Sequence, residues 1–92
     1  MARNLALVTP AAASGFDPYY DRELDARGLS CPLPVLNTRK SVESLASGEV
    51  LKVISTDRGC VSFFESLVRQ TGLELLSWRE QDGEFRFFLR KN

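Results

Sequence analysis

The sequence predicts one α/β domain with two layers, an α+β sandwich in which two helices cover one face of a four-stranded mixed sheet. Segments rich in β-branched and aromatic residues alternate with segments whose apolar residues recur every three or four positions, in the order β-α-β-α-β-β. The 92 residues suffice for one domain, and 43% hydrophobic and 26% charged residues are typical of a globular protein. Because β-α-β crossovers are right-handed, both helices are expected on the same side of the sheet.

Residues 1–19 are expected to form a flexible extension, followed by the folded domain over residues 20–92. Pro10, Gly15 and Pro18 interrupt any regular structure there. The apolar stretch over residues 5–8 is shorter than the roughly 7–15 residues of a secretory signal core, and no apolar run approaches the roughly 20 residues of a membrane span. We therefore expect a cytoplasmic protein without a membrane partner, in agreement with its two cysteines.

The first half of the domain is expected to hold a strand, a helix and a second strand. Residues 22–26 form the first strand, and residues 50–56, which are rich in β-branched side chains, form the second. The spacing of apolar residues predicts a helix over 32–47, ended by Gly48. One stripe of this helix is expected to be buried. It comprises Val35, Leu36, Arg39, Val42, Leu45 and Ala46, with Arg39 contributing the aliphatic part of its side chain.

The second half is expected to hold a helix and a hairpin. The helix spans residues 63–71, because Ser62 and Glu65 have the spacing of a capping box and Gly72 supplies an end. Strands follow over 73–80 and 84–90, and the Asp82-Gly83 pair between them is a strong hairpin signal.

The last two strands carry apolar residues on both faces. On the face away from the helices we expect an exposed cluster of Leu76, Trp78 and Phe88, suited to a partner or a weak dimer of an otherwise monomeric protein. Alternatively, the N-terminal extension covers this face with its aromatic side chains, Phe16, Tyr19 and Tyr20.

The segment around Cys31 carries the most chemical information. Pro32 suits the first position of a helix, where its missing N–H would be unpaired in any case, and Pro34 stiffens the same turn. Cys31 is then expected at the N-cap, where the helix dipole favours the thiolate and lowers the thiol pKa below its usual value of about 8.5. The thiolate is the nucleophilic form, so Cys31 is a candidate for sulfur chemistry. The residue types alone leave open the alternative, a small buried hydrophobic side chain.

Composition argues against several other kinds of site. The 12 basic and 12 acidic side chains cancel, whereas proteins that grip a nucleic-acid backbone usually have a basic excess, so no strong nucleic-acid binding is expected. Histidine is absent, so no imidazole activates Cys31. The cysteines are too far apart in the sequence for a close pair of zinc ligands, and we expect neither a metal nor a cofactor.

Cys60 is a possible second thiol of the same site. The loops after the first and second strands lie at the carboxyl edge of the sheet, where ligands of open α/β sheets bind. Cys31 follows the first strand and Cys60 follows the second. A disulfide needs Cα atoms within about 7 Å, and loops after neighbouring strands come near that limit. The alternative, which inert buried cysteines make the commoner one, is a thiol that only packs.

Several motifs resemble the signature of the TusA (SirA-like) sulfur-carrier family. They are Leu24-Asp25-Ala26-Arg27-Gly28-Leu29, Cys31-Pro32-x-Pro34 and Thr38-Arg39-Lys40, followed by Thr56-Asp57, Gly59 and Gln70-Thr71-Gly72. The resemblance covers about residues 23–91. It implies strand order 1-2-4-3, which puts the phenylalanine-rich last strand inside the sheet.

For function, the resemblance implies a sulfurtransferase-type sulfur carrier with a persulfide on Cys31. The donor would be a cysteine desulfurase or a rhodanese-like protein, and the acceptor a downstream protein of tRNA thiolation, molybdenum-cofactor supply or sulfur oxidation. Pro32 and Pro34 would present the sulfur. The chain departs from the family pattern at Arg58, where proline is common, and at Cys60.

Two alternatives belong to other classes of protein. One is a thiol redox or regulatory protein that uses a reversible Cys31–Cys60 disulfide. The other is a non-catalytic module that binds protein or RNA on the open face of the sheet.

Overall fold

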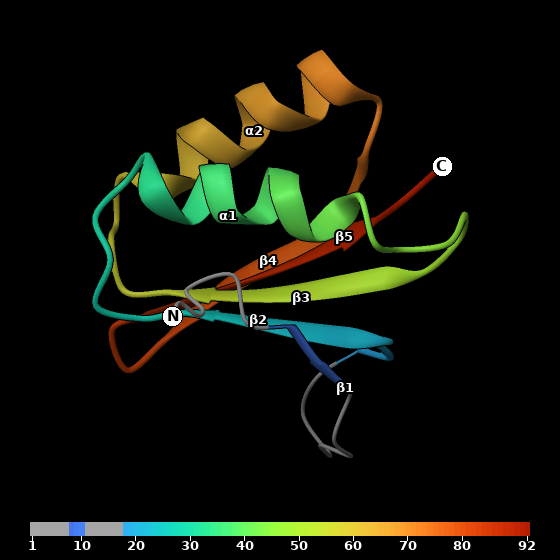
Figure 1. Cartoon of the computed structure of the whole chain (residues 1–92). Coiled ribbons are helices and arrows are strands. Elements are labelled where there is room, and N and C mark those ends of the chain that lie inside the picture. The colour runs from blue at the N-terminus through green and yellow to red at the C-terminus, as the bar shows by residue number, and fades with distance from the viewer. Residues whose placement is uncertain (1–7, 11–17) are drawn as a thin grey trace.

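The structure, a computed structural model, describes residues 8–10 and 18–92. Two helices pack on one face of a single sheet, as Figure 1 shows, so the predicted two-layer α+β fold is confirmed. The elements are β1 (Val8–Pro10), β2 (Arg22–Ala26), α1 (Leu33–Val42), β3 (Val50–Ser55), α2 (Cys60–Thr71), β4 (Glu74–Gln81) and β5 (Glu84–Arg90).

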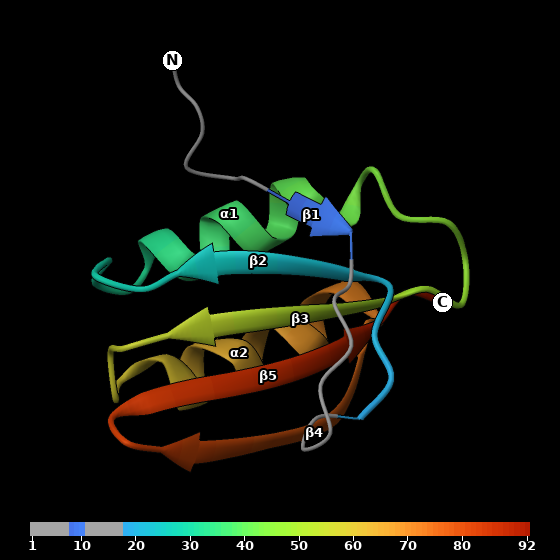
Figure 2. The ribbon, with the colours of Figure 1, turned by 90° about the horizontal axis from the view of Figure 1, so that it is seen from below.

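The strands follow the order β1-β2-β3-β5-β4. β2 and β3 are parallel, whereas β5 is antiparallel to both of its neighbours, β3 and β4 (Figure 2). The four strands that the sequence predicts therefore have the expected order 1-2-4-3. The hairpin between β4 and β5 turns at Asp82 and Gly83, whose φ angles of 54° and 79° are those of the expected two-residue turn.

The short strand β1 is an addition that the sequence did not predict. It pairs antiparallel with β2, with Val8 opposite Leu24 and Pro10 opposite Arg22. It lies within the segment expected to be a flexible extension. The rest of that segment up to residue 17, including Phe16, lies outside the described residues.

The main core lies between the sheet and the helices. Phe64 of α2 stacks on Phe87 of β5, with ring centroids 4.3 Å apart. Around this pair, the buried apolar residues of the sheet and helices include Leu24, Leu51, Val53, Leu67 and Leu89. β5 has a neighbouring strand on each side, and its Phe85 and Phe87 both belong to this core.

Helix α1 is shorter than expected. It ends at Val42 instead of residue 47, because the N–H groups of Glu43, Ser44 and Leu45 donate to carbonyls three residues back, as in a turn. The Lys91 ammonium then donates to two carbonyl oxygens, of Val42 at 3.0 Å and of Leu45 at 2.8 Å. A side chain from the far end of the sequence thus satisfies the acceptors that a longer helix would have used.

The predicted buried stripe of α1 is partly wrong. Val35 and Leu45 are buried, but Leu36 is 48% exposed, and the helix instead buries small polar residues such as Thr38 and Ser41. The Thr38 hydroxyl donates to the Pro34 carbonyl at 2.8 Å, so its burial leaves no unpaired donor.

Helix α2 begins three residues earlier than expected, at Cys60, with Gly59 at the N-cap. The predicted capping box is therefore wrong, and the Ser62 hydroxyl donates to the Gly59 carbonyl at 3.4 Å within the first turn. At the other end Gly72 closes the helix as predicted, with φ of 77° and its N–H donated to Val68.

The expected exposed cluster of Leu76, Trp78 and Phe88 on the open face of the sheet does not form. Leu76 and Trp78 are exposed, but Phe88 is only 1% exposed and packs with Tyr20 and Val50. Phe88 alternates with Phe87 and so lies on the open face, where the buried ring of Tyr20 packs against it. Of the aromatic residues expected as the alternative cover of this face, Tyr20 does cover it, whereas Tyr19 is exposed. The register shift between Leu75 and Ser77 brings Trp78 opposite Phe87, so Trp78 lies on the helix face of the sheet, on the edge strand β4, and not on the open face.

Candidate functional site

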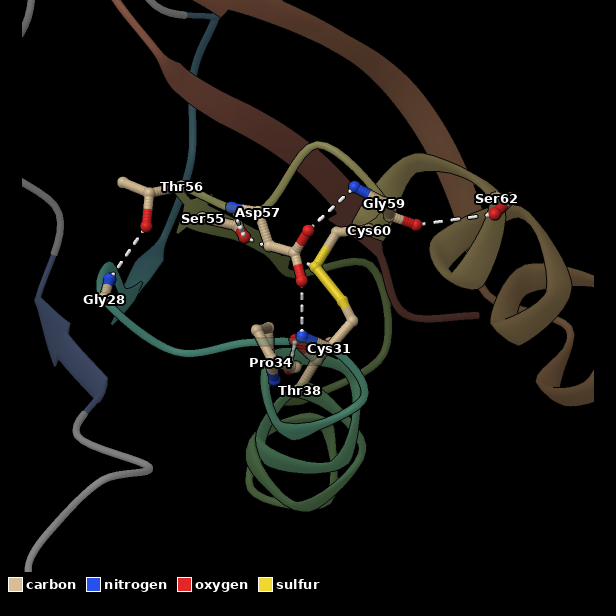
Figure 3. Close-up of a disulfide and its surroundings, with 10 residues drawn as sticks. All are labelled: Gly28, Cys31, Pro34, Thr38, Ser55, Thr56, Asp57, Gly59, Cys60 and Ser62. Carbon is tan, nitrogen blue, oxygen red and sulfur yellow. Dashed lines mark hydrogen bonds between the residues drawn. A yellow bond between two sulfur atoms is a disulfide. The ribbon is translucent and has the colours of Figure 1, made fainter.

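The two cysteines meet at the carboxyl edge of β2 and β3. Cys31 follows β2, Cys60 starts α2 just after β3, and a disulfide joins them with their Cα atoms 5.8 Å apart (Figure 3). The separation is below the limit of about 7 Å for a bridge. The interpretation of Cys60 as a thiol that only packs is therefore wrong, and the expectation that both cysteines lie at one edge of the sheet is confirmed.

The sequence predicted Cys31 at the N-cap of α1, and this prediction is wrong. Pro32 is the cap residue, Leu33 begins the helix, and the Leu33 N–H donates to the Ser30 carbonyl at 3.0 Å. The peptide bond between Cys31 and Pro32 is cis. Pro34 lies in the first helical turn and is buried.

Asp57 holds the two loops together. One carboxylate oxygen accepts the Cys31 N–H at 2.7 Å, and the other accepts the Gly59 N–H at 2.9 Å. These two hydrogen bonds lower the pKa of Asp57, because they favour its charged form. Asp57 was expected only as part of the Thr56-Asp57 motif, with no role of its own. The available signal was an aspartate two residues before a glycine directly after a strand, a pattern typical of an Asx turn.

Cys60 lies in a buried, hydrogen-bonded environment. It is 0% exposed, and the Ser55 hydroxyl, at the end of β3, donates to its sulfur at 3.3 Å. The oxygen of the same hydroxyl accepts the Asp57 N–H at 3.1 Å. Cys31, in contrast, is partly exposed. Of the two bonded cysteines, Cys31 is therefore the one that solvent partly reaches.

The only cluster of potential metal ligands in the described part of the chain is this same group. The two cysteine sulfurs and an Asp57 oxygen lie within 4.8 Å of one another. Cysteine binds metals as the thiolate, and neither sulfur is a thiolate while the disulfide is closed. In this state the site supports thiol–disulfide chemistry.

An open polar hollow lies on the same two loops. Its volume is about 310 Å³, and its lining residues are Gly28, Leu29, Ser30, Thr56, Asp57 and Arg58. The Gly28 N–H, in the loop after β2, donates to the Thr56 hydroxyl, in the loop after β3, at 2.9 Å. Ser30, the residue before Cys31, and Asp57, which accepts the Cys31 N–H, both line the hollow, so the hollow adjoins Cys31.

Comparison with known proteins agrees with the sequence motifs. Residues 22–91 match the family described as sulfurtransferase TusA. The chain is 47% identical over 73 residues to the sulfur carrier protein TusA of Allochromatium vinosum, covering 79% of this chain and 96% of that protein. It is 41% identical over 75 residues to the sulfur carrier protein TusA of Pseudomonas entomophila, covering 82% and 94% respectively. In the described segments, no helix is long and apolar enough to cross a membrane.

Proposed function

We propose that this chain, which belongs to the TusA family of sulfurtransferases, is a sulfur carrier that holds a persulfide on Cys31 and relays its sulfur to an acceptor protein. The observation that carries the proposal is the contrast between the two sulfurs at the edge of the sheet. Cys31 is partly exposed beside an open hollow, whereas Cys60 is fully buried. A sulfur that passes between proteins needs the exposed position.

The proposed cycle uses Cys31 as a free thiolate. With the disulfide reduced, this thiolate attacks the terminal sulfur of a donor persulfide, and the donor thiolate leaves. A thiolate of the acceptor protein then attacks the terminal sulfur on Cys31, which returns to the thiolate. Pro32 and Pro34 support this exchange by shaping the turn that presents the sulfur.

The partners follow from the chemistry of the two steps. We infer a cysteine desulfurase or a rhodanese-like protein as the donor, because both carry sulfane sulfur on a cysteine. The acceptor would belong to tRNA thiolation, molybdenum-cofactor supply or sulfur oxidation in the cytoplasm. The balance of 12 basic and 12 acidic residues favours protein partners over direct binding of nucleic acid.

The test is to load the reduced protein with sulfur from a cysteine desulfurase and cysteine, and to map the added sulfur by mass spectrometry. We expect one sulfur on Cys31 in the natural protein and in the Cys60→Ser variant, and none in Cys31→Ser. Serine retains the backbone N–H that Asp57 accepts, so Cys31→Ser should stay folded. Loading that persists in Cys31→Ser would contradict the proposal.

The disulfide itself favours a second candidate function, a thiol redox protein. In that case the oxidised protein would pass its disulfide to a dithiol substrate, and neither cysteine would carry sulfur. The loading experiment separates the two functions, because only a carrier gains sulfur mass.

A further inference from the structure

We propose that the disulfide form of this protein accepts inorganic sulfide directly, and that the product is the Cys31 persulfide. This inference rests on the proposed function for the residue that carries the sulfur. It adds a route of loading that needs no donor protein. It also gives the Cys31–Cys60 disulfide a place in the reaction sequence, as the oxidised form that sulfide consumes.

The step balances without any other oxidant. Hydrosulfide attacks the sulfur of Cys31, a new sulfur–sulfur bond forms there, and the bond between Cys31 and Cys60 breaks. The incoming sulfur is oxidised to the persulfide level, while the sulfur of Cys60 is reduced to a thiolate. The electron pair of the broken bond stays on Cys60, and the hydrosulfide proton stays with the persulfide or passes to the Cys60 thiolate.

Accessibility directs the attack to Cys31. The sulfur of Cys60 belongs to a residue that is 0% exposed and packs within the main core. Cys31 is partly exposed and only borders that core. In thiol–disulfide exchange the outcome depends on which sulfur the nucleophile can reach. Attack at Cys31 leaves the new sulfur on the side of the molecule that faces solvent.

The surroundings of Cys60 suit a leaving thiolate. The Ser55 hydroxyl already donates to its sulfur at 3.3 Å, and this hydrogen bond strengthens when the sulfur becomes charged. Cys60 is also in the first turn of the 12-residue helix α2, where the helix dipole favours negative charge. Both contacts favour the charged form of the leaving sulfur, so both favour the step.

A disulfide that takes part in turnover also fits the compartment that we propose. In the cytosol, disulfides are usually transient and either catalytic or redox-sensing, because the reducing environment removes the others. A disulfide that sulfide opens is of this transient kind.

The experiment uses the full chain with its disulfide closed, treated anaerobically with one equivalent of sodium sulfide. The thiols and persulfides are then trapped by alkylation and mapped by mass spectrometry. We expect one added sulfur on Cys31 and an alkylated thiol on Cys60. The fully reduced protein is the matched control, and it should gain no sulfur from sulfide because its disulfide is already open.

The Cys60→Ser variant separates this inference from the proposed function. It should gain no sulfur from sulfide, yet still load Cys31 from a cysteine desulfurase and cysteine. A disulfide that survives sulfide treatment, or added sulfur found on Cys60, would overturn the inference and leave desulfurase loading intact. Failure of the natural protein to load from the desulfurase would instead count against the proposed function.

Discussion

Asp57 accepts the backbone N–H of Cys31 across 2.7 Å, so a side chain at the end of one strand positions the loop that follows its neighbour. The same carboxylate accepts the Gly59 N–H, one residue before Cys60. The two cysteines are therefore held by one acidic side chain in addition to their own bond. Changes at Asp57 should affect the folded protein and its sulfur chemistry together.

Replacing Asp57 by asparagine should lower the melting temperature of the oxidised protein by several degrees. An amide has only one oxygen, so it can accept only one of the two N–H groups and turns its own NH₂ toward the other. The measurement is thermal unfolding by circular dichroism. Asp25→Asn is the matched control, since it removes the same charge at the end of β2 but leaves Cys31 and Gly59 untouched.

The effect of Asp57→Asn should depend on pH in a defined direction. The pKa of Asp57 in the folded protein lies below its ordinary value of 3.8. The charged Asp57 carboxylate therefore stabilises the folded protein fully above pH 3.8, and this stabilisation is lost as the pH falls through the pKa that Asp57 has in the folded protein. In urea titrations, the gap between the natural protein and Asp57→Asn should narrow at acid pH. A gap that widened there would contradict this assignment.

Replacing Ser55 by alanine should destabilise the protein by about 1 kcal/mol, because the part-buried Asp57 N–H loses its acceptor. The same change removes the hydroxyl that donates to Cys60, so loading of the oxidised protein by sulfide should slow by roughly tenfold. Stopped-flow loading and urea unfolding give the two values. Ser62→Ala, whose hydroxyl is exposed, should change neither; an equal slowing there would show that the Ser55 effect is nonspecific.

Reduction of the disulfide should cost the protein about 2–4 kcal/mol of unfolding free energy. The bridged residues are 29 apart in the sequence, so the bond restricts a long loop of the unfolded chain. The measurement is urea unfolding with and without dithiothreitol. The Cys60→Ser variant should behave alike under both conditions, and a reductant effect on it would point to a cause other than the disulfide.

The packing of the open face can be tested with Phe88 and Leu76. Phe88→Ala should cost about 3–5 kcal/mol, because it empties the site between Tyr20 and Val50. Leu76→Ala should change stability by about 0.5 kcal/mol or less, since this side chain is 40% exposed. Equal effects of the two substitutions on the urea midpoint would contradict the observed burial.

The sequence alone determined the features that depend on local patterns and on chain handedness. The β-α-β-α-β-β order follows from the periodicity of apolar residues, and the ends at Gly72 and Asp82-Gly83 follow from backbone preferences of single residues. Right-handed crossovers then place Cys31 and Cys60 at one edge of the sheet before any distance is known. The site was predictable to that extent.

Only the tertiary structure decided the features that depend on contacts between distant segments. The end of α1 depends on Lys91, the burial of Phe88 depends on Tyr20, and the face on which Trp78 lies depends on the register shift in β4. Because α2 starts at Cys60, the Cα atom of Cys60 lies 5.8 Å from that of Cys31, and a disulfide joins the two residues. A shift of a few residues in a helix start moves a side chain by several ångströms, enough to make or break a bond that no local pattern encodes.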